Sequence, residues 1–150
     1  VKEVSKDGLI FFTQKGTRKV AEIYNNPSAT FVFWFELWQR EVIFEGRSKP
    51  LTSEENNKHW QEYPREAQVR FYSYAPTSSQ PIKSKERLES LRADIRNQYK
   101  DKELPMSEHY SGFRLIPERL IFYAYQMDVL SDVMEYTSKE HSWTQQLLSP

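Results

Sequence analysis

The chain has 150 residues, and its 21 lysines and arginines are balanced by 21 aspartates and glutamates, which removes the global attraction toward a nucleic acid or an anionic membrane. It has no cysteine and only four scattered glycines, which excludes disulfides, cysteine-ligated metals, a thiolate nucleophile and the glycine-rich phosphate loops. Aromatic residues make up 15% of the chain, enough apolar surface for a single folded domain spanning residues 1–150.

The first part of the chain is predicted to contain three strands and one short helix. Residues 9–13 are apolar and β-prone after a turn, and residues 18–26 have a partly helical pattern, with Thr17 in the N-cap position. Residues 28–38 carry an apolar side chain at every odd position, which predicts a long strand with one dry face. Residues 40–48 alternate in the same way, so these two strands are expected to form an antiparallel pair.

The second part begins with helices and ends with strands. Thr52 and Glu55 form a capping-box pattern that opens a helix ending near Pro64, where another helix can start. A loop is predicted at residues 75–80, followed by a helix capped by Ser84 with one narrow apolar stripe. The remaining strand-like runs are residues 113–116, 120–126 and 129–136. The pattern predicts a mainly β, α+β fold: a small antiparallel barrel of about six strands with inserted helices.

Neither a membrane-spanning segment nor a metal site is expected. No stretch approaches the length of a membrane-spanning helix, and the first residues lack the apolar run of a signal peptide, so we predict a soluble, cytoplasmic protein. His59, His109 and His141 are isolated, without a second ligand at helical spacing, so no metal site is predicted.

A candidate anion site lies where the first strand leads into the first helix. Phe12 and Thr13 end the strand, and Arg18 and Lys19 stand in the first turn of the helix. Free N–H groups and the positive end of the helix dipole favour an anion there, and two cationic side chains strengthen that preference. Such a site suits a phosphate monoester, although the same pair also fits an ordinary solvated helix surface.

Tryptophans suggest where a partner binds. Both faces of the strand at residues 31–38 are rich in apolar groups, which indicates burial on one side by the barrel and on the other by a partner subunit. Trp34, Trp38 and Trp60 are the candidate interface residues.

The segment from Gly8 to Gly46 resembles the FMN-binding core of the pyridoxine (pyridoxamine) 5′-phosphate oxidases, against which it aligns without a gap. The likeness rests on Phe11-Phe12-Thr13, Arg18-Lys19, Asn25-Asn26-Pro27 and Arg40-Glu41-Val42. It continues more weakly through Tyr63-Pro64-Arg65 to a Trp143–Pro150 ending of the family type. The resemblance implies an FMN-binding split barrel that forms a homodimer with the flavin at the subunit interface.

The resemblance also implies residue roles. Arg18 and Lys19 would contact the flavin phosphate, and Lys2 falls where the family has a substrate-binding lysine. The family's first flavin-contacting segment would lie before Val1, so the chain is expected to lack the family's N-terminal segment. The positions matching flavin contacts are Phe12, Thr13, Arg18, Lys19, Glu41, Ser78 and Tyr123. No catalytic residue is assigned.

Several of the family's functional positions are altered. Glu41 replaces a glutamine, and a carboxylate cannot donate the hydrogen bond that an amide can. The Tyr, Arg and Ser that hold the substrate phosphate in the family become His59, Tyr63 and Ala67. Near the C-terminus, the substrate Arg and His become Val129 and Ser131, and a flavin-contacting Arg becomes Val133. The loss of several charge-assisted contacts predicts that tight binding of pyridoxine 5′-phosphate is lost.

Three functions remain open from the sequence. The first is a divergent FMN-binding flavoprotein, an oxidoreductase if it is active, whose vitamin B6 phosphate clamp is largely replaced and whose candidate ligand is a phosphorylated small molecule. The second is a non-catalytic paralogue, a pseudoenzyme that keeps the barrel as a dimeric binding or assembly module. The third is an active FMN-dependent pyridoxamine 5′-phosphate oxidase that makes pyridoxal 5′-phosphate.

Overall fold

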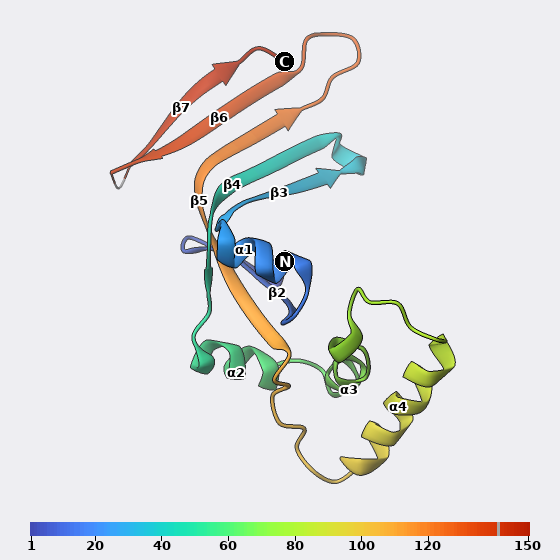
Figure 1. The fold of residues 1–150 in the computed structure, drawn as a ribbon. Coiled ribbons are helices and arrows are strands. Elements are labelled where there is room, and N and C mark those ends of the chain that lie inside the picture. Colours follow the sequence, from blue (N-terminus) through green and yellow to red (C-terminus); the bar gives the residue numbers. More distant parts are fainter. Residues whose placement is uncertain (141) are drawn as a thin grey trace. The chain divides into compact units, whose positions relative to one another are not determined.

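A computed structural model describes residues 1–140 and 142–150, so His141 lies outside the described residues (Figure 1). The strands are β1 (Glu3–Ser5), β2 (Gly8–Gln14), β3 (Ser28–Phe35), β4 (Arg40–Pro50), β5 (Tyr110–Ala124), β6 (Asp132–Lys139) and β7 (Ser142–Leu148). The helices are α1 (Arg18–Asn25), α2 (Ser53–Gln61), α3 (Arg65–Tyr74) and α4 (Lys85–Gln98), with short 3₁₀ turns at Glu36–Trp38 and Ala75–Thr77. No helix in this described part is long and apolar enough to span a membrane.

The predicted fold class is confirmed, but the strand count differs because the described residues form a seven-stranded sheet. The short β1 and the terminal β7 were not predicted, whereas two predicted strands on either side of Pro117 are one strand, β5. Pro117 lies against Gly46, where an added Cβ would stand 2.8 Å from the Pro117 Cα and 2.0 Å from the Ile116 oxygen. The missing side chain of Gly46 therefore lets β5 pass without a break.

Two compact units make up the structure, and each is described by itself. The sheet unit comprises residues 1–10, 26–49 and 114–150. The helical unit comprises residues 11–25 and 50–113.

The sheet unit is built on antiparallel strand pairs. The strand order is β1-β2-β5-β4-β3, with β6 also paired to β5 and β7 paired to β6. The predicted pairing of β3 with β4 is confirmed, with Phe31 opposite Phe44. β3 ends at Phe35 instead of Trp38, because Gln39 adopts a left-handed φ of 48° and closes a 3₁₀ turn. Leu9 and Leu115 are fully buried in this unit.

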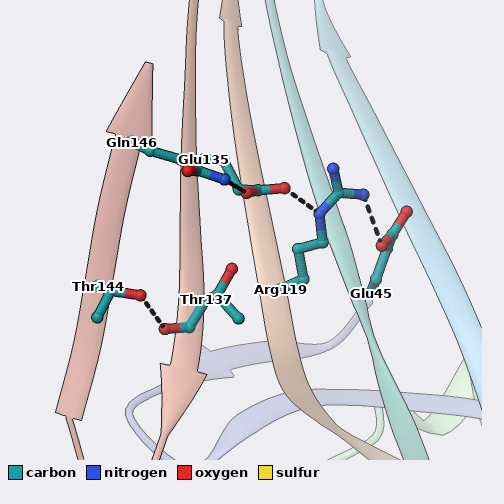
Figure 2. Close-up of polar contacts among 6 residues, drawn as sticks. All are labelled: Glu45, Arg119, Glu135, Thr137, Thr144 and Gln146. Carbon is teal, nitrogen blue, oxygen red and sulfur yellow. Dashed lines mark hydrogen bonds and ion pairs between the residues drawn. The ribbon is translucent and has the colours of Figure 1, made fainter. Parts of the chain in front are cut away.

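A row of polar side chains crosses the sheet unit, and we call Glu45, Arg119, Glu135 and Gln146 the polar belt (Figure 2). Arg119 on β5 binds Glu45 on β4 at 3.0 Å and also donates to Glu135 on β6, and Gln146 on β7 donates to the other Glu135 oxygen. The Gln146 hydrogen bond and then Arg119 lower the pKa of Glu135, while hydrogen bonds to Glu45 and Glu135 raise that of Arg119. The belt therefore links four neighbouring strands by charged hydrogen bonds.

The helical unit is packed around an aromatic core. Trp60 is 1% exposed, its ring lies 5.0 Å from that of Tyr110, and its indole N–H donates to the Leu104 carbonyl at 3.0 Å. The prediction that Trp60 is an exposed interface residue is therefore wrong, whereas Trp34 and Trp38 are 49% and 68% exposed. Trp60 is buried because it lies on the face of α2 that packs against Val69 and Phe71 of α3 and Ile95 near the end of α4.

Capping and cross-links fix the helices of this unit. The capping box of α2 is confirmed, since the Thr52 hydroxyl accepts from the Glu55 N–H and the Glu55 carboxylate accepts from the Thr52 N–H. Ser84 stands at the N-cap of α4 but makes no side-chain capping bond, so that part of the prediction is wrong. The Arg65 guanidinium donates to the Tyr99 carbonyl and Gln68 donates to the Trp60 carbonyl at 2.7 Å, which ties α3 to α4 and α2.

Candidate functional site

The anion site predicted from the sequence falls at the start of α1. Thr17 precedes the helix, its carbonyl accepts from Val20 at 3.1 Å, and its hydroxyl donates to the Gln14 carbonyl at 2.9 Å. Gly16 has a φ of 85°, and a Cβ added there would meet nothing within 4 Å, so the approach to the helix is open. Val20 already donates to Thr17, so the first-turn N–H groups left to a ligand are those of Arg18 and Lys19, because the first N–H groups of a helix have no intrahelical acceptor.

The two cations stand in that first turn. Arg18 has a side chain that is 91% exposed and pairs with the exposed carboxylate of Glu22 at 2.9 Å. Lys19 is exposed as well. Because an exposed ion pair contributes little to stability, Arg18 can exchange Glu22 for a stronger anion.

Phe12 and Thr13 lie near the end of β2, in different surroundings. Phe12 is half-buried, with its ring stacked 4.7 Å from Tyr110 and edge-on to His59 at 5.2 Å. Thr13 is 5% exposed. The Phe12 side chain thus belongs to the aromatic core, while β2 leads from Thr13 into the open turn before α1.

Ser78 is brought to the same strand end by a residue that the sequence did not single out. The Ser78 hydroxyl donates to the Gln14 Oε1 at 3.1 Å, and the Gln14 amide donates to the Tyr74 hydroxyl at 3.3 Å. Burial raises the pKa of Tyr74, which keeps its hydroxyl neutral near pH 7. A glutamine directly after the Phe-Thr pair was the available signal, but only the fold shows that it reaches residues sixty and sixty-four positions away.

The helical-unit positions of the family's phosphate clamp offer little to an anion. His59 is 8% exposed, and its buried Nδ1 lies 3.6 Å from a Glu62 oxygen without making a hydrogen bond. The Tyr63 ring packs against Trp60 and Tyr110 at 6.3 and 6.4 Å. Within residues 1–140 and 142–150, no three histidines or carboxylates gather into a group that could hold a metal ion.

In the sheet unit, Lys2 lies at an aromatic cavity. A hollow of about 460 Å³ is lined by Lys2 together with Phe33, Phe44 and Phe122. The Lys2 backbone N–H donates to the Ile10 carbonyl at 2.7 Å, which fixes the start of the chain beside β2. Glu3 lines the same hollow, so one lysine and one carboxylate stand at a mainly aromatic lining, which suits a planar, apolar ring.

Glu41 and Tyr123 are brought together in the sheet unit. Both line a second cavity, of about 500 Å³, together with Trp38, Met134 and Leu147. Its walls are mainly apolar, and Glu41 is half-buried among them. Arg40 and Asp132 line the cavity as well, so Glu41 is one of three charged residues at these mainly apolar walls.

The loop between β5 and β6 presents apolar side chains where the family has charged ones. Val129 is 63% exposed, while the Ser131 hydroxyl accepts from the Gln126 N–H at 3.1 Å and stays within the loop. Val133 is 5% exposed and lies on β6 opposite Tyr123. None of these three positions presents a cation.

Solved structures identify the class of protein that this fold defines. The chain superimposes on PhzG from Burkholderia lata 383, solved in complex with tetrahydrophenazine-1-carboxylic acid, with a TM-score of 0.85, 23% identity and coverage of 99% of this chain and 72% of that one. A pyridoxamine 5′-phosphate oxidase-related, FMN-binding protein from Nostoc punctiforme PCC 73102 matches with a TM-score of 0.74, 16% identity and coverage of 95% and 73%. The fold is therefore of the split-barrel class.

Sequence comparisons then give the family. The pyridoxamine 5′-phosphate oxidase model matches residues 1–124, and the model of the pyridoxine 5′-phosphate oxidase C-terminal dimerisation region matches residues 110–150. The pyridoxine/pyridoxamine 5′-phosphate oxidases of Nostoc sp. strain PCC 7120 and Myxococcus xanthus strain DK1622 are 32% and 31% identical to this chain, which they match over its whole length and over 70% and 72% of their own. The chain belongs to the pyridoxamine 5′-phosphate oxidase family.

Proposed function

We propose that this chain is a divergent flavoprotein of its family, which binds FMN at the start of α1 and has exchanged the vitamin B6 phosphate clamp for other side chains. The observation that carries the proposal is the hydrogen bond of 3.1 Å from Ser78 to Gln14, which joins Ser78 to the strand end between Thr13 and the Arg18-Lys19 pair. Thr13 and Gln14 lie on β2, and Ser78 directly follows the 3₁₀ turn at Ala75–Thr77.

The residues present fit the phosphate of FMN. A phosphate needs several hydrogen-bond donors and positive charge, and the first turn of α1 combines free N–H groups with two exposed cations. The open space beside Gly16 leaves room for an anion to approach the backbone. When bound, FMN supplies the electron acceptor of the family's oxidations, while the protein holds and orients it.

The visible absorption spectrum of the purified chain, with and without added FMN, tests this proposal. We expect bound flavin to remain with the protein through gel filtration and to be released on denaturation. A protein that stays colourless at saturating FMN would contradict the cofactor assignment and favour the non-catalytic alternative.

The substrate is proposed to be a ring compound without a phosphate group. Two observations support this: the clamp positions Tyr63, Val129 and Ser131 lack a cation, and a cavity floored by Phe33 and Phe44 is lined by Lys2 and Glu3, whose charges balance. The fold resembles PhzG, which was solved with a fused-ring carboxylic acid. An aromatic floor whose single lysine stands beside a carboxylate suits a flat ring with at most one carboxylate better than a dianionic phosphate.

Oxygen consumption separates the remaining alternatives. We expect oxidation of a partly reduced fused-ring carboxylic acid and no significant turnover of pyridoxine or pyridoxamine 5′-phosphate. Normal turnover of either phosphorylated vitamer would instead establish the active oxidase. If flavin binds but neither class of substrate reacts, the ring-acid assignment is wrong.

The proposed assembly is a homodimer. The C-terminal match to a dimerisation region and the exposed Trp34, Trp38 and Leu147 in the sheet unit support it. Sedimentation velocity tests it, with a dimer expected at micromolar concentration and a monomer contradicting the proposal.

A further inference from the structure

A cavity of about 530 Å³ lies in the helical unit between the end of α3 and α4. Figure 1 shows the loop that leaves α3 and returns to the start of α4, and Pro76, Thr77 and Pro81 of this loop form one wall of the cavity. None of its lining residues belongs to the predicted cofactor or substrate contacts, so the cavity is a feature of its own.

The floor of this cavity is apolar and uncovered. The sequence predicts a narrow apolar stripe along α4, and only its C-terminal part is used in the core, where Ile95 is 8% exposed. Leu91 remains 41% exposed and Leu88 half-buried, and both line the cavity together with Ile82, which is 46% exposed. Apolar surface on a helix stripe that no protein segment covers favours an apolar ligand.

The rim of the cavity is mainly cationic. Lys83 and Arg87 line it against one carboxylate, Asp94. Among residues 1–140 and 142–150, Lys83 and Arg87 make no ion pair, whereas Arg92 and Arg96 of the same helix are paired with Glu89 and Glu66. The two unpaired cations are therefore available to a negative group above the apolar floor.

We propose that this cavity binds a small amphiphilic carboxylic acid. The apolar part of the ligand packs against Leu88, Leu91 and Ile82, and its carboxylate lies between Lys83 and Arg87. Charge complementarity selects this occupant over a neutral apolar compound, because a carboxylate gains charge-assisted hydrogen bonds from both cations. The proposal is independent of FMN, since no residue of the α1 start takes part.

The test is a titration of the whole 150-residue chain with octanoate. Binding is monitored by the changes in amide chemical shift in the ¹H–¹⁵N NMR spectrum of the protein. Octan-1-ol and acetate are the comparison probes, each carrying only one half of the proposed ligand. We expect octanoate to shift amides within residues 76–94 and to bind at least about tenfold more tightly than either comparison probe.

Variants then assign the two halves of the site. Arg87→Gln is expected to weaken octanoate binding about tenfold, and Leu91→Ser to weaken it as well, both with a native spectrum elsewhere. Arg92→Gln is the matched control, because Arg92 lies on the same helix and is paired with Glu89 at 3.1 Å, and it should bind octanoate as the parent does. Shifts confined to other residues, equal binding of octan-1-ol, or unchanged binding by Arg87→Gln would each overturn the proposal.

Discussion

Two arginines, one in each unit, differ in how firmly their guanidinium groups are bound to carboxylates. Arg18 of the helical unit is 91% exposed at the side chain and shares one exposed carboxylate, whereas Arg119 of the sheet unit is held between Glu45 and Glu135. Exposed pairs exchange readily with other anions, but a guanidinium whose donors are already matched to two carboxylates does not.

The comparison extends to the units that carry them. The helical unit keeps Arg18 and Lys19 available at a helix start, while the sheet unit has no cation at Val129, Ser131 or Val133 and uses Arg119 to join its strands. The cations at the start of α1 are thus free to meet an anion, whereas Arg119 is occupied by the two carboxylates that it joins.

The largest expected effect tests whether the cations at α1 hold a ligand. Arg18→Ala combined with Lys19→Ala should weaken FMN binding by at least about 100-fold, because two charge-assisted contacts of about 1.5–3 kcal/mol each are removed. The melting temperature should hardly change, since the Arg18–Glu22 pair is exposed. Fluorescence titration of FMN measures the first effect and circular dichroism the second.

The matched control for that double variant is Lys100→Ala with Lys102→Ala, two exposed cations between α4 and β5. It removes the same number of charges and should leave FMN binding unchanged. Equal weakening by both double variants would mean that only net charge matters, and the contrast between the two arginines would then fail.

A substitution of Arg119 tests whether the polar belt stabilises the sheet unit. Arg119→Met should lower the melting temperature clearly, because Glu135, which is 6% exposed, loses its cationic partner. Arg18→Met is the matched control and should melt like the parent. Adding Glu135→Leu to Arg119→Met should recover part of the loss, and no difference between Arg119→Met and Arg18→Met would show that the polar belt does not stabilise the sheet.

Local patterns predicted much of the fold. The alternation in residues 28–38 and 40–48 gave the β3–β4 pair, and the Thr52 and Glu55 capping box formed with both of its hydrogen bonds, because each depends on neighbouring residues. β7 was not predicted, since its seven residues are ordered by pairing with β6, as when Gln146 lies opposite Glu135. Polar residues on a strand carry no sign of such a partner.

The candidate site was predictable to a similar degree. Arg18 and Lys19 stand in the first turn of α1 as predicted, because a short helix after a Gly-Thr turn is encoded locally. The bridge from Ser78 through Gln14 to Tyr74 was not, since it joins residues sixty and sixty-four positions apart. The roles that the resemblance assigned to Phe12, Glu41, Tyr123 and Lys2 stay predictions until ligand binding is measured.

The lowered pKa of Glu135 predicts how the stability of the sheet unit changes on acidification. Hydrogen bonds from Gln146 and Arg119 lower the pKa of Glu135 in the folded protein, so near pH 4 the unfolded chain binds more protons at this residue. Its stabilising contribution is complete above the ordinary carboxyl pKa of about 4.3 and is lost as the pH falls through the lower folded value. Thermal melts from pH 7 to 3 should therefore show a smaller loss in Glu135→Gln than in the parent, and parallel curves would contradict the assignment.

The smallest expected effect concerns Glu41, the family's glutamine position in the sheet unit. If Glu41 lies close to bound FMN, its charge opposes the flavin phosphate and it cannot donate as an amide does. Glu41→Gln should then tighten FMN binding about fivefold, a gain of about 1 kcal/mol, and added salt should reduce the difference because it screens the repulsion. Glu118→Gln, an exposed carboxylate of β5, is the control and should bind FMN as the parent does. Weaker binding by Glu41→Gln would mean that the carboxylate accepts a hydrogen bond from the flavin, and this departure from the family would then favour the cofactor instead of opposing it.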